Sequence, residues 1–313
     1  MIAFLDGIRG KGNVYHQGQP GELRTGLIPH VLPNVTVLNW QQYSTWDTAP
    51  PDVILVSMFP NSDGVCRNLK ARFPKTRIIA WIDPGVDVLL SHYGTDQHNM
   101  IRDLAFADAI GTWDPSLKHG QFLSMMTGGK RVIEIPIPLI PGAEHLRQSP
   151  KENLIMGVLH CQPPRQPGAT LATVQALARA TSCDVVIFDD RNANAEAVSA
   201  FTGASWRIIT TFKEAYHLLP SCRLMVDLYA IHHYGRMATH AANVGTLSIS
   251  SSWCADVGHV RVDPWSDEGY REAMALWDAK KKQDWHLAEG YTILKLRHSP
   301  DRIRKQILSV LED

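Results

Sequence analysis

The stretch from Leu224 to Ser252 constrains the fold of this chain more than any other. It begins with an apolar run, 224–228, that is typical of a buried strand, and a polar turn follows. A helix of small residues, 237–244, then ends at Gly245, and 246–250 has the composition of a second strand. A strand, a loop, a helix and a strand in this order form half of a doubly wound α/β domain, whose ligands bind at the carboxyl ends of the strands.

The loop between these two strands contains residues that suit an anionic ligand. His232, His233 and Arg236 supply hydrogen-bond donors and positive charge, and Gly235 lets the backbone approach a ligand closely. The first turn of the helix adds unpaired N–H groups and the positive end of the helix dipole. These features predict a phosphate or diphosphate site. The alternative is a plain crossover whose loop is polar, with surface histidines.

The same alternation of strands and helices runs through the rest of the chain. Most of the strand-like runs are continuously apolar, which favours parallel sheets buried on both faces. The expected strands are 1–5, 35–39, 52–59, 77–82, 109–113, 132–137, 154–159, 184–188, 206–210 and 260–262, and the expected helices are 61–73, 99–107, 117–126, 169–180, 212–219, 270–282 and 300–311. Asn61 or Ser62 is the expected N-cap of the first helix.

Proline and glycine interrupt this alternation between Pro136 and Asn153. The length of 313 residues suits two domains of about 150 residues each. We therefore predict an N-terminal domain over 1–140 and a C-terminal domain over 153–313, and we allow the C-terminal helix to pack back on the first domain.

Composition limits the partners and the compartment. Lys and Arg together number 31, as do Asp and Glu, so no overall basic field attracts nucleic acid or an anionic membrane. The 5 cysteines form no C-x-x-C pair, which is typical of reduced thiols. No run approaches the roughly 18 apolar residues of a membrane span, and Asp6 comes too early for a signal peptide. We expect a soluble, cytoplasmic protein without integral membrane association.

Polar residues also follow the predicted strands of the N-terminal half. Asp6, Gly7, Arg9, Gly10 and Lys11 come directly after the first strand. A strand followed by a glycine-rich loop indicates a ligand loop, although the spacing matches neither dinucleotide-binding nor P-loop motifs. A flexible surface loop is the alternative.

Two further aspartates, Asp83 and Asp114, follow strands 77–82 and 109–113. Either carboxylate suits the activation of a hydroxyl, but an aspartate before Pro84 is equally typical of a turn.

Several segments resemble those of GT-B glycosyltransferases that use nucleotide-sugar donors and retain configuration. Residues 107–116 and 132–138 are similar to the "aDavi…S" and "v.vipNG" segments that close the first domain, but the Asn-Gly is missing here. Residues 154–168 resemble the segment that opens the donor domain, and 184–190 resemble the strand before the nucleobase pocket. Residues 229–251 are similar to "E-x-F-G-…-E-A-x-A-x-G-x-P-V-I-x-S".

The resemblance implies two Rossmann-like doubly wound domains that face a cleft, with the acceptor on the first and the donor on the second. It implies transfer of a sugar from a nucleotide-diphosphate sugar, with a UDP-sugar expected, to an acceptor hydroxyl. When the family motif is aligned with this sequence at Gly245, the motif's glutamate, which hydrogen-bonds the donor ribose in the family, corresponds to His240. The expected donor-binding residues are His160, Arg165, His232, His233, Gly235, Arg236, His240, Gly245 and Thr246.

On the acceptor side, the resemblance places Ile82-Asp83 where many relatives have His-Asp. Asp83 is therefore the first candidate for a base or orienting carboxylate, with Asp6 as the second and Asp114 as a further rival. The glycine-rich loop of Gly7, Arg9, Gly10 and Lys11 would border the acceptor.

Neither a metal nor another cofactor is expected, because basic residues and N–H groups can stabilise the leaving diphosphate. The histidines His232, His233, His240 and His259 have no carboxylate at metal-ligand spacing beside them.

The acceptor and the oligomeric state stay open. Glycans, lipids, small molecules, proteins and, in some phages, hydroxymethylated DNA bases are acceptors of such enzymes. The basic run from Arg67 to Arg77 suits a DNA backbone or simply faces water. A sugar-nucleotide epimerase of the same fold, or a catalytically degenerate binding or scaffold protein, are the alternative functions.

Overall fold

The computed structural model consists of two compact units, one of Met1–Pro138 with Arg297–Asp313 and one of Leu139–Leu296. We call them unit 1 and unit 2. The structure describes residues 1–6, 28, 32, 34–38, 49–58, 64–82, 94–114, 116–139, 142–159, 168–189, 192–201, 206–229, 234–252 and 259–312. The predicted first domain, 1–140, ends close to Pro138, and Arg297–Asp313 groups with unit 1, in keeping with the allowance made for the C-terminal helix. Leu139 to Glu152, which was left between the two predicted domains, groups with unit 2.

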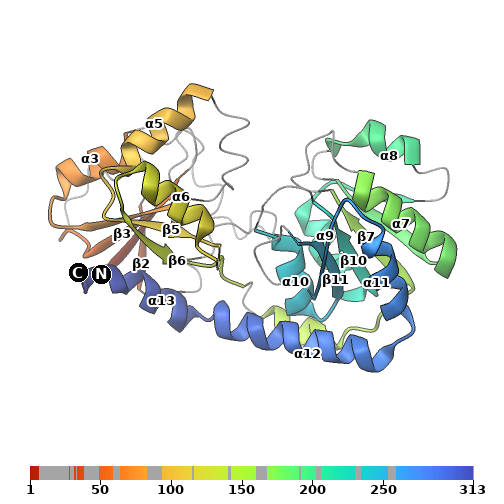
Figure 1. The fold of residues 1–313 in the computed structure, drawn as a ribbon. Helices are drawn as coiled ribbons and strands as arrows, with labels where there is room; N and C mark the ends of the chain where they lie inside the picture. The colour runs from red at the N-terminus through yellow and green to blue at the C-terminus, as the bar shows by residue number, and fades with distance from the viewer. Residues whose placement is uncertain are drawn as a thin grey trace. The chain divides into compact units, whose positions relative to one another are not determined.

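Unit 1 contains a six-stranded parallel sheet in the order β2-β1-β3-β4-β5-β6 (Figure 1). Its strands are β1 (Ile2–Asp6), β2 (Val35–Leu38), β3 (Val53–Met58), β4 (Arg77–Ile82), β5 (Ala109–Thr112) and β6 (Arg131–Glu134). The helices described with it are α3 (Val65–Arg72), α5 (Gly94–Leu104), α6 (Lys118–Met126) and α13 (Pro300–Leu308), with the 3-10 turn η7 (Ser309–Leu311). The strand order changes direction between β1 and β3, so the loops after these strands flank the switch point of the sheet.

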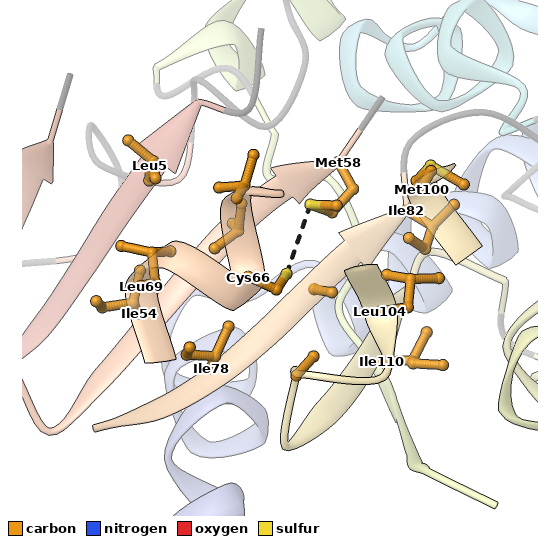
Figure 2. Close-up of a cluster of buried hydrophobic side chains, with 14 of the residues drawn as sticks. Leu5, Ile54, Met58, Cys66, Leu69, Ile78, Ile82, Met100, Leu104 and Ile110 are labelled. Carbon is orange, nitrogen blue, oxygen red and sulfur yellow. Dashed lines mark hydrogen bonds between the residues drawn. The ribbon is translucent and has the colours of Figure 1, made fainter. Parts of the chain in front are cut away.

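The core of unit 1 forms where α3, α5 and α6 pack on one face of this sheet (Figure 2). All six residues of β3 are buried, as expected for a parallel strand covered on both faces. Within this core the Cys66 thiol points at the thioether of Met58, with 3.9 Å between the two sulfur atoms. Burial raises the pKa of the Cys66 thiol well above its usual value, with the nearby Asp103 carboxylate adding to this effect. Cys66 is therefore a packed, neutral thiol.

The start of α3 differs from the sequence-based prediction. Gly64 occupies the N-cap position with φ 75° and supplies no side-chain cap, so neither Asn61 nor Ser62 caps the described helix. Instead the buried carboxylate of Asp103 in α5 accepts hydrogen bonds from the N–H groups of Cys66 at 2.8 Å and Arg67 at 3.0 Å. A carboxylate on another helix thus satisfies the free N–H groups of α3.

Unit 2 contains a second six-stranded parallel sheet, in the order β12-β11-β10-β7-β8-β9. Counted along the chain this is the 3-2-1-4-5-6 order of a Rossmann domain. Its strands are β7 (Leu154–Val158), β8 (Asp184–Phe188), β9 (Arg207–Ile209), β10 (Leu224–Asp227), β11 (Leu247–Ser251) and β12 (Val260–Val262). Its helices are α7 (Gly168–Thr181), α8 (Ala195–Phe201), α9 (Phe212–Leu218), α10 (Arg236–Val244), α11 (Glu268–Trp277) and α12 (Lys280–Arg297), with the 3-10 turns η4 (Ala143–Gln148) and η6 (Leu219–Ser221).

The predicted strands are confirmed to within a few residues, and so is the doubly wound α/β class. The helices differ from the prediction in three places. The segment predicted as one helix over 270–282 belongs to two helices, because α11 ends at Trp277 and α12 runs from Lys280 to Arg297. Helix α8 was not predicted, and α5 begins at Gly94 rather than at 99.

No described helix combines the length and the apolar character that crossing a membrane requires. Among the described cysteines, Cys66, Cys183 and Cys222 are free thiols.

Candidate functional site

In unit 2 the strand order reverses between β7 and β10, which lie side by side. Open α/β sheets bind ligands at such a switch point, outside the carboxyl ends of the strands. The loop after β7 leads to α7 and the loop after β10 leads to α10. The end of β10 is tied to α7, because the N–H of Leu228 after β10 donates to the hydroxyl of Thr170 in the first turn of α7 at 3.0 Å.

Helix α10 presents its amino end at this switch point. Gly235 is its N-cap with φ 72°, a left-handed conformation that favours glycine. As a glycine, this N-cap supplies no side-chain cap to the first N–H groups of the helix. Arg236 is the first residue of the helix and its side chain is half-buried. Gly235 and Arg236 are thus the described residues of the anion site predicted after β10, and that site stays a prediction.

Arg236 is held against an aromatic row on α9. Its guanidinium carbon lies 5.6 Å from the centre of the Phe212 ring. Phe212 stacks on Tyr216 with 5.7 Å between ring centres, and Tyr216 meets His240 edge-on at 4.7 Å. The Nε of Arg236 is buried and has no hydrogen-bond partner among the described residues. The Arg236 side chain is thus positioned by packing against Phe212.

At the carboxyl edge of this sheet lie two polar residues that were not predicted from the sequence. Asp227 ends β10 and pairs in register with Ser250 near the end of β11. Both are buried, and they lie on the same face of the sheet as Met225, which packs against α10. The Oγ of Ser250 has no hydrogen-bond partner among the described residues. Asp227 is the single polar residue in the otherwise apolar run Leu224 to Leu228, and this was the sequence feature that could have indicated it.

Two predicted donor-binding residues lie elsewhere. Gly245 ends α10 as a left-handed C-cap with φ 72°, and Thr246 precedes β11, so both are at the amino edge of the sheet. The Thr246 hydroxyl donates to the Leu219 carbonyl at 2.5 Å and accepts from Lys151 Nζ at 3.0 Å. A Cβ on Gly245 would lie 3.2 Å from the Arg147 backbone. Both residues therefore serve the packing of α10, and neither is placed to contact a ligand at the carboxyl edge.

The acidic end of β8 also has a structural role. The buried carboxylate of Asp189 accepts from the backbone N–H of Asn194 at 2.8 Å and from its side-chain amide at 3.0 Å. These bonds hold the turn that leads into α8, as expected for a capping aspartate.

In unit 1 the switch point lies between β1 and β3, and Asp6 is the last residue of β1. Asp114 follows β5 and is 1% exposed. Its carboxylate accepts from the N–H of Ser116 at 2.8 Å and from the N–H of His119 at 3.2 Å. Asp114 is thus occupied in holding the turn before α6, which leaves Asp6 and Asp83 as the carboxylate candidates.

Several predicted site residues lie outside the described residues: Gly7, Arg9, Gly10, Lys11, Asp83, His160, Arg165, His232 and His233. Their assignment stays a prediction. Within the described part of the chain, no group of three or more His, Cys, Asp or Glu side chains is arranged to hold a metal ion.

Comparison with known proteins identifies the fold. No protein-family model matches the chain, and no curated protein sequence matches it. Among solved structures, Anabaena HepE in complex with UDP and glucose superposes with a TM-score of 0.71 at 13% identity, covering 100% of this chain and 99% of that one. The chain has the GT-B fold.

Two further GT-B structures match most of the chain. A UDP-forming α,α-trehalose-phosphate synthase from Burkholderia xenovorans gives a TM-score of 0.66 at 13% identity, covering 87% of this chain and 76% of that one. The trehalose-6-phosphate protein from E. coli, bound with UDP-2-fluoro glucose, gives 0.64 at 10% identity, covering 85% and 74%.

Proposed function

We propose that the chain is a glycosyltransferase that moves a sugar, with glucose as the first candidate, from a UDP-sugar to an acceptor hydroxyl. The observation that carries this proposal is the first turn of α10, where Gly235 and Arg236 stand at the switch point of a Rossmann-type sheet. The solved structures of the same fold include complexes with UDP-glucose and with UDP and glucose, which supports this donor class.

In the proposed mechanism, the donor diphosphate lies against the N–H groups at the start of α10 and against the Arg236 guanidinium. Positive charge at this point stabilises the negative charge that develops on the leaving UDP. His160, Arg165, His232 and His233 are proposed to add donors from the loops after β7 and β10. Asp83, or else Asp6, is proposed to orient or deprotonate the acceptor hydroxyl.

The acceptor is proposed to be a hydroxyl of a sugar, a glycan or another small molecule. The solved neighbours include a complex with glucose 6-phosphate and a complex with UDP and glucose, which favours this class of acceptor for a first screen. A hydroxymethylated DNA base has no comparable support and enters the screen as a second arm.

Binding of UDP, UDP-glucose, GDP-glucose and ADP-glucose to the purified chain, measured by calorimetry, tests the donor. We expect UDP and UDP-glucose to bind, and Arg236→Ala to weaken UDP binding by about 1.5–3 kcal/mol, the contribution of a hydrogen bond to a charged group. Lys213→Ala, at an exposed position of neighbouring α9, is the matched control and should leave the affinity unchanged.

The outcomes separate the candidate functions. UDP binding that Arg236→Ala does not alter removes Arg236 from the site. Conversion of a UDP-sugar to its epimer without any acceptor identifies an epimerase of the same fold. Absence of binding to every nucleotide favours a catalytically degenerate binding or scaffold protein.

A further inference from the structure

One edge of the unit 1 sheet collects three helix ends. α3, α5 and α6 lead into β4, β5 and β6, so their carboxyl ends reach the amino edge of the sheet, opposite the edge where ligands of such folds bind. These three strands are hydrogen-bonded neighbours in the sheet. Because neighbouring strands lie about 4.8 Å apart, the turns 73–76, 105–108 and 127–130 form one continuous surface.

This surface exposes large apolar side chains. Phe106, after α5, is 44% exposed, and Met125 and Met126, at the end of α6, are 70% and 50% exposed. Single exposed apolar residues are ordinary on protein surfaces, but here they come from two adjoining helix ends. Unbranched methionine side chains adapt readily to irregular apolar surroundings.

Cations outnumber carboxylates in these turns and in the helix ends before them. Lys75 and Lys130 lie in the turns, and Arg102 lies in the last turn of α5. The three turns, all of which the structure describes, contain a single carboxylate, Asp108. That carboxylate is already paired with Lys70 at 2.9 Å and with Arg77 at 3.3 Å. Helix dipoles favour cations at helix carboxyl ends, but they do not account for the exposed Phe and Met side chains beside them.

We propose that this surface docks on an anionic lipid bilayer. We call it the entry-turn surface and define it by Lys75, Arg102, Phe106, Met125, Met126 and Lys130. The apolar side chains enter the interface between headgroups and acyl chains, while the cations contact lipid phosphates. A nucleic-acid backbone would also attract the cations, but it would leave the apolar side chains in water. The combination therefore favours lipid, and the proposal is independent of the transferase activity.

Co-sedimentation of the full chain with lipid vesicles tests this proposal. We expect binding to vesicles of phosphatidylcholine mixed with phosphatidylglycerol, little binding to phosphatidylcholine alone, and weaker binding at high salt. Lys75→Gln combined with Lys130→Gln should lower the partition coefficient by about fivefold for each charge removed. Met125→Ser combined with Met126→Ser should lower it as well, without changing its salt dependence.

A matched variant in unit 2, Trp265→Ser combined with Lys281→Gln, removes one apolar side chain that is 72% exposed and one exposed cation. It should bind anionic vesicles like the unaltered chain, and thermal melting shows that each variant is folded. The proposal is overturned if the chain does not co-sediment with anionic vesicles, or if the unit 2 variant loses as much vesicle binding as the entry-turn variants. It is also overturned if the methionine variant binds vesicles fully while duplex DNA competes for the same lysines.

Discussion

His259 makes the stability of unit 2 sensitive to acid. Its Nδ1 accepts a hydrogen bond from the Ser248 N–H at 3.0 Å, so the proton of the neutral ring lies on Nε2. Burial lowers the pKa of His259 from 6.5 to about 3, and the neighbouring His286, Arg147 and Lys151 add to this effect. The charged form of the imidazole is thus strongly disfavoured in the folded protein.

The size of the effect follows from the difference between the folded and the unfolded pKa of His259. A histidine whose folded pKa is lowered contributes full stability above its unfolded pKa and loses it as the pH falls towards its folded pKa. With values of 6.5 and about 3, this group's contribution begins to fall near pH 6.5. At about pH 5 the loss amounts to about 2 kcal/mol, at 1.36 kcal/mol for each pH unit.

His259→Asn tests this reasoning, because an asparagine Oδ1 can still accept from Ser248 but does not titrate. We would measure urea unfolding at several pH values between about 7.5 and about 5, with hydrogen exchange of β11 peptides as the local reading. The variant will be less stable than the unaltered chain at neutral pH, but its stability should fall by about 2 kcal/mol less on acidification. His217→Asn, at an exposed position of α9, should keep the original pH dependence. Parallel pH profiles for His259→Asn and the unaltered chain would refute the reasoning.

Two further substitutions test the packing around α12, and Arg271→Ala on α11 serves as an exposed control. Gly290→Ala should destabilise unit 2 by about 1–3 kcal/mol in urea unfolding, since its Cβ would lie 2.7 Å from a carbon of the buried His259 ring, and an unchanged midpoint would contradict this close packing. Arg297→Ala should cost about 1–3 kcal/mol in the unfolding of unit 1, because Glu134 loses the buried Arg297, whose Nε lies 2.8 Å away, and among the described residues keeps only Arg302 at 3.0 Å as a partner. Arg271→Ala, which breaks an exposed ion pair on α11, should cost less than about 1 kcal/mol, and an equal loss would contradict the role of burial.

Most strands of this protein are predictable from the sequence, because a strand buried on both faces has a continuous apolar sequence. β4 and β8 have the predicted bounds, and all six residues of β3 are buried. Helix α12 was missed over most of its length for the opposite reason. Its exposed Trp285, Ile293 and Leu296 and the buried Gly290 give no one-sided apolar period, since the helix packs through glycine as well as through apolar side chains.

The caps and hydrogen-bond partners depend on tertiary contacts that local patterns do not contain. Asp103 caps α3 from a position 37 residues along the chain from Cys66, so the local candidates Asn61 and Ser62 misled the prediction. Thr246 follows the motif of the ligand loop in sequence, but a helix length separates it from Gly235 in space. The motif from Gly235 to Thr246 runs along α10 from the carboxyl edge of the sheet to its amino edge. Only its first part is therefore placed to contact a ligand bound at the carboxyl edge.

This geometry assigns the proposed donor contact to the first turn of α10 rather than to its body. Every side chain from Met237 to Val244 is buried, and Ala238, Ala241 and Met237 belong to the core beneath the helix. His240, where the GT-B resemblance places a ribose-binding glutamate, is 3% exposed and packs on Tyr216. A histidine here thus joins the aromatic row of α9 that positions Arg236. With histidine at this position in place of glutamate, the proposed donor recognition depends on Arg236 and on the N–H groups beside it. These are the groups that a diphosphate at the carboxyl edge reaches first.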